Sequence, residues 1–137
     1  RERPPGEDRD SPSLWPVRGL ITSPFGMRPS PYDGTREMHS GIDIQAHYGM
    51  PVTASGDGEV IFAGRDSGYG RLVVVSHGGN LDTFYGHLSA IYVREGQRVR
   101  RGQPIGAVGA SGRATGAHLH YEVRVRNSPV DPHRYLN

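Results

Sequence analysis

Short runs of β-branched and aromatic residues recur about every ten residues along most of the chain. Six of these runs predict strands, at residues 41–45, 59–63, 71–76, 81–85, 104–108 and 118–125. Turn sequences that contain glycine, such as SGDG, SGYG and HGGN, separate them. This rhythm is typical of antiparallel sheets, sandwiches and barrels. We therefore predict a mainly β, antiparallel, sandwich-like domain with little helix, in which residues 88–91 are the one place for a helical turn.

The first fifteen residues differ from the rest of the chain in composition. They are polar, charged and rich in proline (RERPPGEDRDSPSLW), and Leu14 and Trp15 are their anchors. A segment of this composition buries too little apolar surface to fold alone. We expect residues 1–15 to be a flexible linker or arm, and residues 16–137 to be one domain that is long enough to enclose a core. Because the chain begins with Arg1, we expect it to be part of a longer protein.

Composition excludes several kinds of chemistry. The chain has no cysteine, so disulfides and thiolate metal sites are impossible. All 16 basic residues are arginine, and the absence of lysine excludes a lysine Schiff base or a prosthetic group attached to lysine. The formal net charge of +2 is small and scattered, which argues against a nucleic-acid partner. No apolar run is long enough to predict a membrane span.

Two pairs of residues indicate a metal site. In GAHLHYEV, His118 and His120 are two residues apart in a predicted strand, so their side chains lie on the same face. In HSGID, His39 and Asp43 are four residues apart, which is about 13 Å in an ideal strand. Zinc holds such ligands at about 2.0–2.2 Å, so this segment must bend sharply or make a helical turn. Gly41 lies between the two residues, where a bend costs least.

His87, in DTFYGHLS, is the fifth candidate. It follows a glycine at the end of a predicted strand, where its ring can lean over a groove, although taken alone it is typical of a surface or capping residue. A catalytic zinc takes three protein ligands and keeps a fourth position for water. Four histidines and one aspartate exceed that number, and the surplus imidazoles suit proton transfer and oxyanion stabilisation during hydrolysis. Spacing alone does not say which histidines are the ligands.

Five blocks of sequence follow one another between the arm and the C-terminus: ITSPFGMRPSP, MHSGIDIQAHYGMPVTASGDGEVIFAG, GYGRLVVVSHGGNLDTFYGHLS, VREGQRVRRGQPIGAVGASGRATGAHLHYEV and VDPHRYL. In this order they resemble the lysostaphin-type, or LytM-like, zinc endopeptidases of bacterial cell walls. The resemblance implies that His39, Asp43 and His120 bind one zinc ion (Zn2+) per chain, and that His118 and His87 are the catalytic pair. It also implies an antiparallel β fold with a groove over the metal.

The same resemblance implies a function and a location. The expected substrate is the peptide cross-links of peptidoglycan, cut by a monomeric catalytic domain outside the cytoplasm, in the periplasm, in the cell envelope or as a secreted protein. Family members cut glycine–glycine bridges or D-alanyl cross-links, and we expect a D,D-endopeptidase because direct cross-links are the commoner wall chemistry. Residues 28–37 (RPSPYDGTRE) are expected to form one wall of the groove, and the glycine-rich stretch GASGRATG a loop beside it.

Two other function classes compete with this one. A non-catalytic LytM-like domain would activate a separate cell-wall amidase, but such relatives have lost metal ligands, and in this chain all five positions are filled. A carrier domain is suggested by VREGQRVRRGQPIGAVGA, which resembles one hairpin of biotinyl and lipoyl domains, but the chain has no lysine for attachment. Of the other histidines, we expect His77 to be structural and His47 and His133 to be surface residues.

Overall fold

The computed structural model describes residues 9–30, 33–110 and 116–137. Within these residues the strand pairs are all antiparallel, and the helical content is a single 3-10 turn, so the mainly β fold expected from the sequence is confirmed. The elements are β1 (Leu20–Ser23), β2 (Gly26–Pro29), β3 (Arg36–His39), β4 (Ile42–Gln45), β5 (Pro51–Thr53), β6 (Gly58–Asp66), β7 (Gly70–Ser76), β8 (Leu81–Ile91), β9 (Arg98–Val99), β10 (Pro104–Val108), β11 (His118–Val125), β12 (Ser128–Val130) and the 3-10 turn η1 (Pro132–Arg134).

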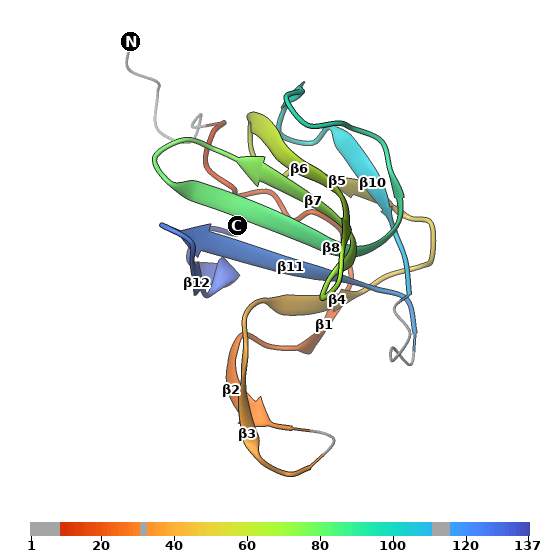
Figure 1. Ribbon diagram of the computed structural model, residues 1–137, viewed down its shortest axis with the longest axis vertical. Helices are drawn as coiled ribbons and strands as arrows, with labels where there is room; N and C mark the ends of the chain where they lie inside the picture. The colour runs from red at the N-terminus through yellow and green to blue at the C-terminus, as the bar shows by residue number, and fades with distance from the viewer. Residues whose placement is uncertain (1–8, 31–32, 111–115) are drawn as a thin grey trace.

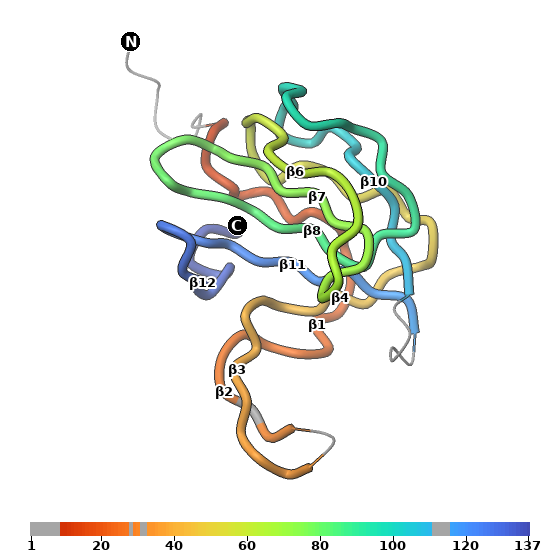
Figure 2. The backbone as a smooth tube through the Cα atoms, in the orientation of Figure 1, coloured from red at the N-terminus to blue at the C-terminus, as the bar shows by residue number. Residues whose placement is uncertain are grey.

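One large sheet holds most of the strands (Figure 1). Its order is β1-β4-β11-β8-β7-β6-β9, with β10 paired to both β5 and β8, and β12 paired to β11. Strands β2 and β3 form a separate hairpin that projects from the body of the molecule (Figures 1 and 2). Strands β4, β11 and β8 are neighbours in the sheet although they are far apart in the sequence. Side chains from these three strands can therefore meet on one face.

The six strands expected from the hydrophobic pattern are present, and β6 and β8 extend several residues further than expected. The helical turn expected at residues 88–91 is wrong, because these residues continue β8. Leu88 is buried there and pairs with Arg71 of β7 on one side and with Val108 of β10 on the other. A helix at this place would leave backbone groups of both neighbouring strands without partners.

One face of the large sheet packs into the hydrophobic core. Along β11, Leu119, Tyr121 and Val123 are fully buried, and the ring of Tyr121 lies 5.4 Å from the ring of Tyr85 in β8. Alternate residues of a strand point to opposite faces. The two histidines of β11 therefore point away from this core, and the packing of their neighbours fixes the strand that carries them.

A chain of buried hydroxyl groups ends at His77. Its Nε2 lies 2.8 Å from Thr83 Oγ1, which lies 2.7 Å from the hydroxyl of Tyr85. Its Nδ1 lies 2.8 Å from the backbone oxygen of Asp57. Burial lowers the pKa of His77, so the ring is neutral at pH 7 and both of its nitrogens have partners. This agrees with the structural role expected for His77.

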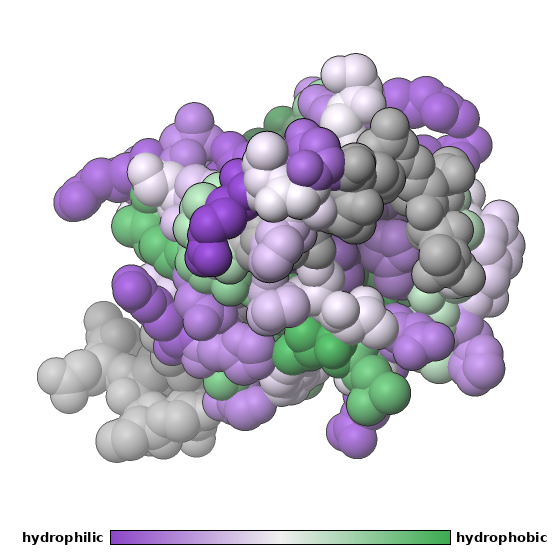
Figure 3. Space-filling model, turned by 90° about the horizontal axis from the view of Figure 1, so that it is seen from below, coloured by the Kyte–Doolittle hydropathy of each residue, from purple (hydrophilic) through white to green (hydrophobic). Residues whose placement is uncertain are grey.

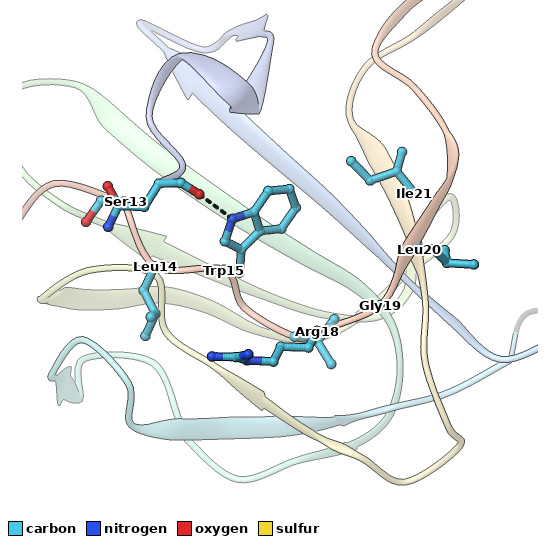
Figure 4. A pocket seen from close by; sticks show the side chains of 9 residues that line it. Ser13, Leu14, Trp15, Arg18, Gly19, Leu20 and Ile21 are labelled. Carbon is cyan, nitrogen blue, oxygen red and sulfur yellow. Dashed lines mark hydrogen bonds between the residues drawn. The ribbon is translucent and has the colours of Figure 1, made fainter.

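The described part of the expected arm lies against the domain. Trp15 donates its indole N–H to the backbone oxygen of Asn137 at 2.7 Å, and its ring packs against the core. Figure 4 draws the hydrogen bond of Trp15 as a dashed line. The backbone N–H of Leu14 donates to the oxygen of Ser55 at 3.1 Å. Beside this segment is a hollow of about 730 Å³, lined by Ser13, Leu14, Trp15, Val17, Arg18, Gly19, Leu20, Ile21 and Asn137. Residues 1–8 lie outside the described residues, and the boundary between residues 15 and 16 stays a prediction.

Some large apolar side chains lie at the surface, and two of them, Met27 and Met38, are direct partners in the β2–β3 hairpin. Leu20 is 73% exposed, Tyr48 69%, and Met27 and Met38 on the projecting hairpin 55% and 50%. On the face shown in Figure 3, the hydrophobic areas are small and separated by hydrophilic side chains. Among the described residues, no helix has the length and apolar character that a membrane crossing requires.

A sharp bend at Gly41 joins β3 to β4. His39 is the last residue of β3, and Asp43 is the second residue of β4. A Cβ atom at Gly41 would lie 2.2 Å from the backbone oxygen of Tyr121 in β11, which is far inside contact distance. The bend that the sequence predicted between His39 and Asp43 therefore occurs where the absence of a side chain lets β4 approach β11.

We predict that Gly41→Ala lowers the free energy of unfolding by about 1–3 kcal/mol, the usual cost of forcing an extra carbon into packed structure, and displaces Asp43. The control is Gly64→Ala in β6, where the nearest atom to an added Cβ belongs to the Phe62 ring at 3.7 Å. Urea denaturation, followed by the fluorescence of Trp15, measures both variants. Equal stability of the two would contradict the role assigned to Gly41.

Candidate metal centre

His39, Asp43 and His120 come together on the face of the sheet opposite the core. One potential ligand atom of each residue lies within 4.8 Å of those of the other two. Asp43 of β4 and His120 of β11 are direct partners across the strand pair, and the bend at Gly41 brings His39 to them. Both histidines are 8% exposed, and Asp43 is half-buried. Two imidazoles and a carboxylate are a donor set that suits zinc.

In each histidine ring of this cluster, one nitrogen faces Asp43 and the other has a hydrogen-bond partner that is not part of the cluster. Nδ1 of His39 lies 2.8 Å from the backbone oxygen of Pro24, and its Nε2 lies 3.4 Å from Oδ2 of Asp43. Nε2 of His120 lies 2.8 Å from Oε2 of Glu122, and its Nδ1 lies 2.9 Å from Oδ1 of Asp43. Metal-binding histidines commonly donate their second N–H to a carbonyl or carboxylate in this way. The residues present therefore fit a metal ion.

The charges of the cluster also favour a cation. Burial raises the pKa of Asp43, but hydrogen bonds from His120 and His39 outweigh burial and hold this pKa well below its usual range. Burial lowers the pKa of His120, but hydrogen bonds to Asp43 and Glu122 outweigh it and raise the pKa to about 9. Burial also raises the pKa of Glu122, but hydrogen bonds from His120, Ser40 and Tyr69 outweigh it and lower this pKa. Asp43 and Glu122 are thus both ionised, and positive charge on His120 lies between them. A divalent cation can supply that charge when the extra proton leaves His120.

His118 and His87 lie beside this cluster. The centroid of the His87 ring is 5.4 Å from that of His118 and 6.0 Å from that of His120. Nδ1 of His118 lies 3.3 Å from the backbone oxygen of Gly116, which favours a proton on Nδ1 and a lone pair on Nε2. Burial lowers the pKa of His87, and the neighbouring His120 and His118 lower it further. His87 is therefore neutral at pH 7 and can accept a proton.

His87 reaches this face because the backbone of β8 departs from a regular strand. Its φ is 59°, in the left-handed region, and the pairing of β7 with β8 shifts between Arg71 and Val73 as at a β-bulge. In a regular strand His87 would share the face of Tyr85 and point into the core. The bulge turns it toward the other histidines, and a hydrogen bond from its backbone N–H to the oxygen of Tyr69, at 2.7 Å, holds it there.

Four polar residues of this centre were missed in the sequence: Glu122, Arg124, Tyr69 and Ser40. Glu122 is fully buried and lies next to His120 on the same face of β11. Ser40 and Tyr69 donate to one of its carboxylate oxygens and Arg124 to the other. A signal for two of the four was available, because polar residues alternate with apolar ones throughout HLHYEVR, which places them on one face.

The other residues singled out in the sequence lie away from the cluster or outside the described residues. His47 and His133 are exposed, as expected. Residues 28–37 contribute to the β2–β3 hairpin, but residues 31–32 are not described, and neither is 111–115 in the glycine-rich stretch. The groove expected over the metal stays a prediction.

Three known proteins show close similarity to this chain. The DD-carboxypeptidase/endopeptidase Mpg of Neisseria meningitidis serogroup B is 50% identical over 112 residues, which cover 82% of this chain and 26% of that protein. The peptidoglycan DD-endopeptidase ShyB of Vibrio cholerae is 46% identical over 112 residues, which cover 81% and 26%. The crystal structure of a zinc containing peptidase from Vibrio cholerae matches with a TM-score of 0.75 and 44% identity, covering 85% of this chain and 37% of that one.

The chain spans about a quarter (26%) of the length of these two curated relatives. The sequence model of Peptidase family M23 matches residues 37–132, which is more than half of the chain and includes all five candidate residues. Together with the relatives, this match confirms the resemblance to lysostaphin-type zinc peptidases that the sequence blocks indicated: the chain belongs to peptidase family M23.

Proposed function

We propose that this chain is the catalytic domain of a zinc-dependent endopeptidase that hydrolyses D,D peptide cross-links of bacterial peptidoglycan. One observation carries the proposal: two further imidazoles, those of His87 and His118, lie beside the His39–Asp43–His120 cluster. A structural zinc site closes around its metal with four ligands, whereas a catalytic site keeps an open position with proton-transfer groups nearby. The activities for which Mpg and ShyB are named support the D,D bond as the substrate.

His39, Asp43 and His120 would hold one zinc ion. His39 would bind through Nε2 and His120 through Nδ1, because the other nitrogen of each ring is engaged by Pro24 or Glu122. When bound, zinc lowers the pKa of a water molecule and polarises the carbonyl of the bond to be cut. Asp43 contributes a negative charge as well as an oxygen, and it lies between the two rings.

His87 and His118 would transfer the protons. Hydrolysis of a peptide bond removes a proton from the attacking water and gives one to the leaving amine, so the groups beside the bond must accept and then donate. A neutral imidazole accepts the first proton, and the second ring can donate a hydrogen bond to the oxyanion. With their centroids 5.4 Å apart, the two rings are close enough to act on one peptide bond.

A non-catalytic domain that activates an amidase is the alternative. The presence of all five side chains, and their convergence on one face, favour the enzyme. We also propose that the chain acts outside the cytoplasm, where peptidoglycan lies, as the monomeric catalytic part of a longer protein.

The direct test is incubation of the purified chain and zinc with muropeptides of defined cross-link, with products identified by mass spectrometry. We predict cleavage of D-alanyl cross-links to a diamino acid and no cleavage of glycine–glycine bridges. A zinc-loaded chain that cuts neither, but increases the activity of a wall amidase, would support the alternative function instead.

We predict that single alanine substitutions separate ligands from proton-transfer groups. His120→Ala is expected to lose most of its zinc and all activity. His118→Ala and His87→Ala are expected to keep zinc and lose activity by about 10²–10⁴-fold, the usual contribution of general acid–base catalysis. Metal analysis and muropeptide assays measure both properties, with the exposed His47→Ala as the control. Full zinc occupancy in His120→Ala, or a metal-free His87→Ala, would overturn the roles assigned to these histidines.

We predict that cleavage is fastest from neutral to mildly alkaline pH and falls as the pH drops below about 6. The pKa of His87 lies below its ordinary 6.5, so its proton-accepting form is complete above that pH and is lost as the pH falls through the lowered value. Because the pKa of His120 is about 9 without a cation, protons also compete with zinc, and zinc uptake weakens as the pH falls.

The measurement is a pH–rate profile with and without excess zinc. Added zinc is expected to restore the part of the loss that comes from metal release, but not the part that comes from protonation of His87. Undiminished cleavage at about pH 4.5 would contradict the roles of the imidazoles.

A further inference from the structure

A fully buried carboxylate lies behind the metal centre. Glu122 is 0% exposed, and it stands between His120 and Arg124 on the same face of β11. An ionised carboxylate in such a place is costly unless it is paired and hydrogen-bonded. Its surroundings supply both kinds of partner, so the carboxylate can stay ionised next to His120.

Three donors converge on one oxygen of Glu122. Ser40 Oγ donates to Oε2 at 2.6 Å, the hydroxyl of Tyr69 donates at 2.6 Å, and Nε2 of His120 lies at 2.8 Å. Arg124 donates from Nε to the other oxygen, Oε1, at 2.8 Å. The guanidinium neutralises the carboxylate, so the acid can stay ionised and act as an acceptor for all four groups.

The two groups that hold Glu122, Arg124 and Tyr69, are themselves held in place. Arg124 also donates to the hydroxyl of Tyr69 at 2.9 Å, so Tyr69 accepts from one side and donates to Glu122 on the other. The guanidinium lies over the ring of Phe84, 4.3 Å from its centroid, and the ring of Tyr69 lies 5.6 Å from that of His120. The carboxylate of Glu122, the guanidinium of Arg124 and the phenol of Tyr69 thus form one packed unit beside the ring of His120.

This unit determines which nitrogen of His120 carries the proton. With hydroxyl protons already directed at Oε2, the carboxylate offers only lone pairs to Nε2. When His120 gives up one proton to bind a metal, the proton that it keeps is therefore on Nε2. The lone pair of the neutral ring is then on Nδ1, which faces Asp43 at 2.9 Å. The opposite tautomer would place the lone pair of Nε2 against the Glu122 carboxylate, and it would place the N–H of Nδ1 at the proposed metal position.

We propose that Glu122 is a positioning residue: held by Arg124, Tyr69 and Ser40, it fixes His120 in the tautomer and ring orientation that present Nδ1 to the metal. The proposal rests on the part of the proposed function that makes His120 a metal ligand, and it is independent of which peptide bond is cut. It assigns a role in metal binding to residues outside the five that the family resemblance implied.

The first experiment compares Glu122→Gln with Glu59→Gln, an equivalent change at an exposed position of β6. The side-chain amide introduced by Glu122→Gln has one oxygen acceptor and one NH₂ donor, so its NH₂ group must face either Arg124 or the three converging donors. We expect the zinc affinity of Glu122→Gln, measured by competition with a chelator, to fall about 10–100-fold, and that of Glu59→Gln to be unchanged. A folded Glu122→Gln variant with wild-type zinc affinity would overturn the proposal.

A second variant covers the case in which Glu122→Gln does not fold. Tyr69→Phe keeps the aromatic ring and removes only the hydroxyl that joins Glu122 to Arg124. We expect a smaller loss of zinc affinity than for Glu122→Gln, with the thermal midpoint of the metal-free protein nearly unchanged. Because the proposal requires Tyr69 to hold Glu122 in place, wild-type zinc affinity in Tyr69→Phe would overturn it.

The decisive readout needs no variant. Long-range ¹H–¹⁵N spectra of the zinc-loaded wild-type chain report which nitrogen of His120 carries a proton. We expect the proton on Nε2 and the metal on Nδ1, and the reverse assignment would overturn the proposal. A chain that gives the expected spectrum but cuts no muropeptide would contradict the proposed function and leave this inference standing.

Discussion

The contact between Asp43 and His120 across β4 and β11 connects the candidate site to the fold. The two residues are direct partners in the strand pair, with Oδ1 and Nδ1 2.9 Å apart. Their neighbours in the two strands, such as Ile42 and Tyr121, are fully buried on the other face. A shift of one residue between these strands would carry a carboxylate and an imidazole into the core. The packing that stabilises the domain therefore also fixes the spacing of Asp43 and His120, two of the three residues proposed to bind the metal.

Two local departures from regular strand geometry bring in the other histidines. The bend at Gly41 returns the chain so that His39 stands beside Asp43, and it requires a residue without a side chain because Tyr121 lies so close. The left-handed backbone at His87 reverses the direction that alternation along β8 would give it. In both cases the sheet supplies a rigid frame, and a local change in the backbone redirects a side chain of the candidate site.

The sequence predicted the strands because they bury alternate residues, and it predicted that His118 and His120 share a face for the same reason. It also predicted a bend at Gly41, since an extended segment would leave His39 and Asp43 too far apart. It did not predict the reversal at His87, because a bulge depends on pairing with strands distant in sequence. The helix expected at residues 88–91 failed for the same reason: β7 and β10 pair with that backbone on both sides. Glu122 was overlooked although it continues the alternation that identified His120.

Both proposals depend on a single metal ion held on this face by His39, Asp43 and His120, with Glu122 behind the ring of His120. A crystal structure of the zinc-loaded chain, with the metal located by anomalous scattering at the zinc edge, would show this arrangement directly. We expect one zinc site, bound by Nε2 of His39, a carboxylate oxygen of Asp43 and Nδ1 of His120, with His87 and His118 outside the ligand set. Zinc bound through His87 or His118, or through Nε2 of His120, would contradict this arrangement.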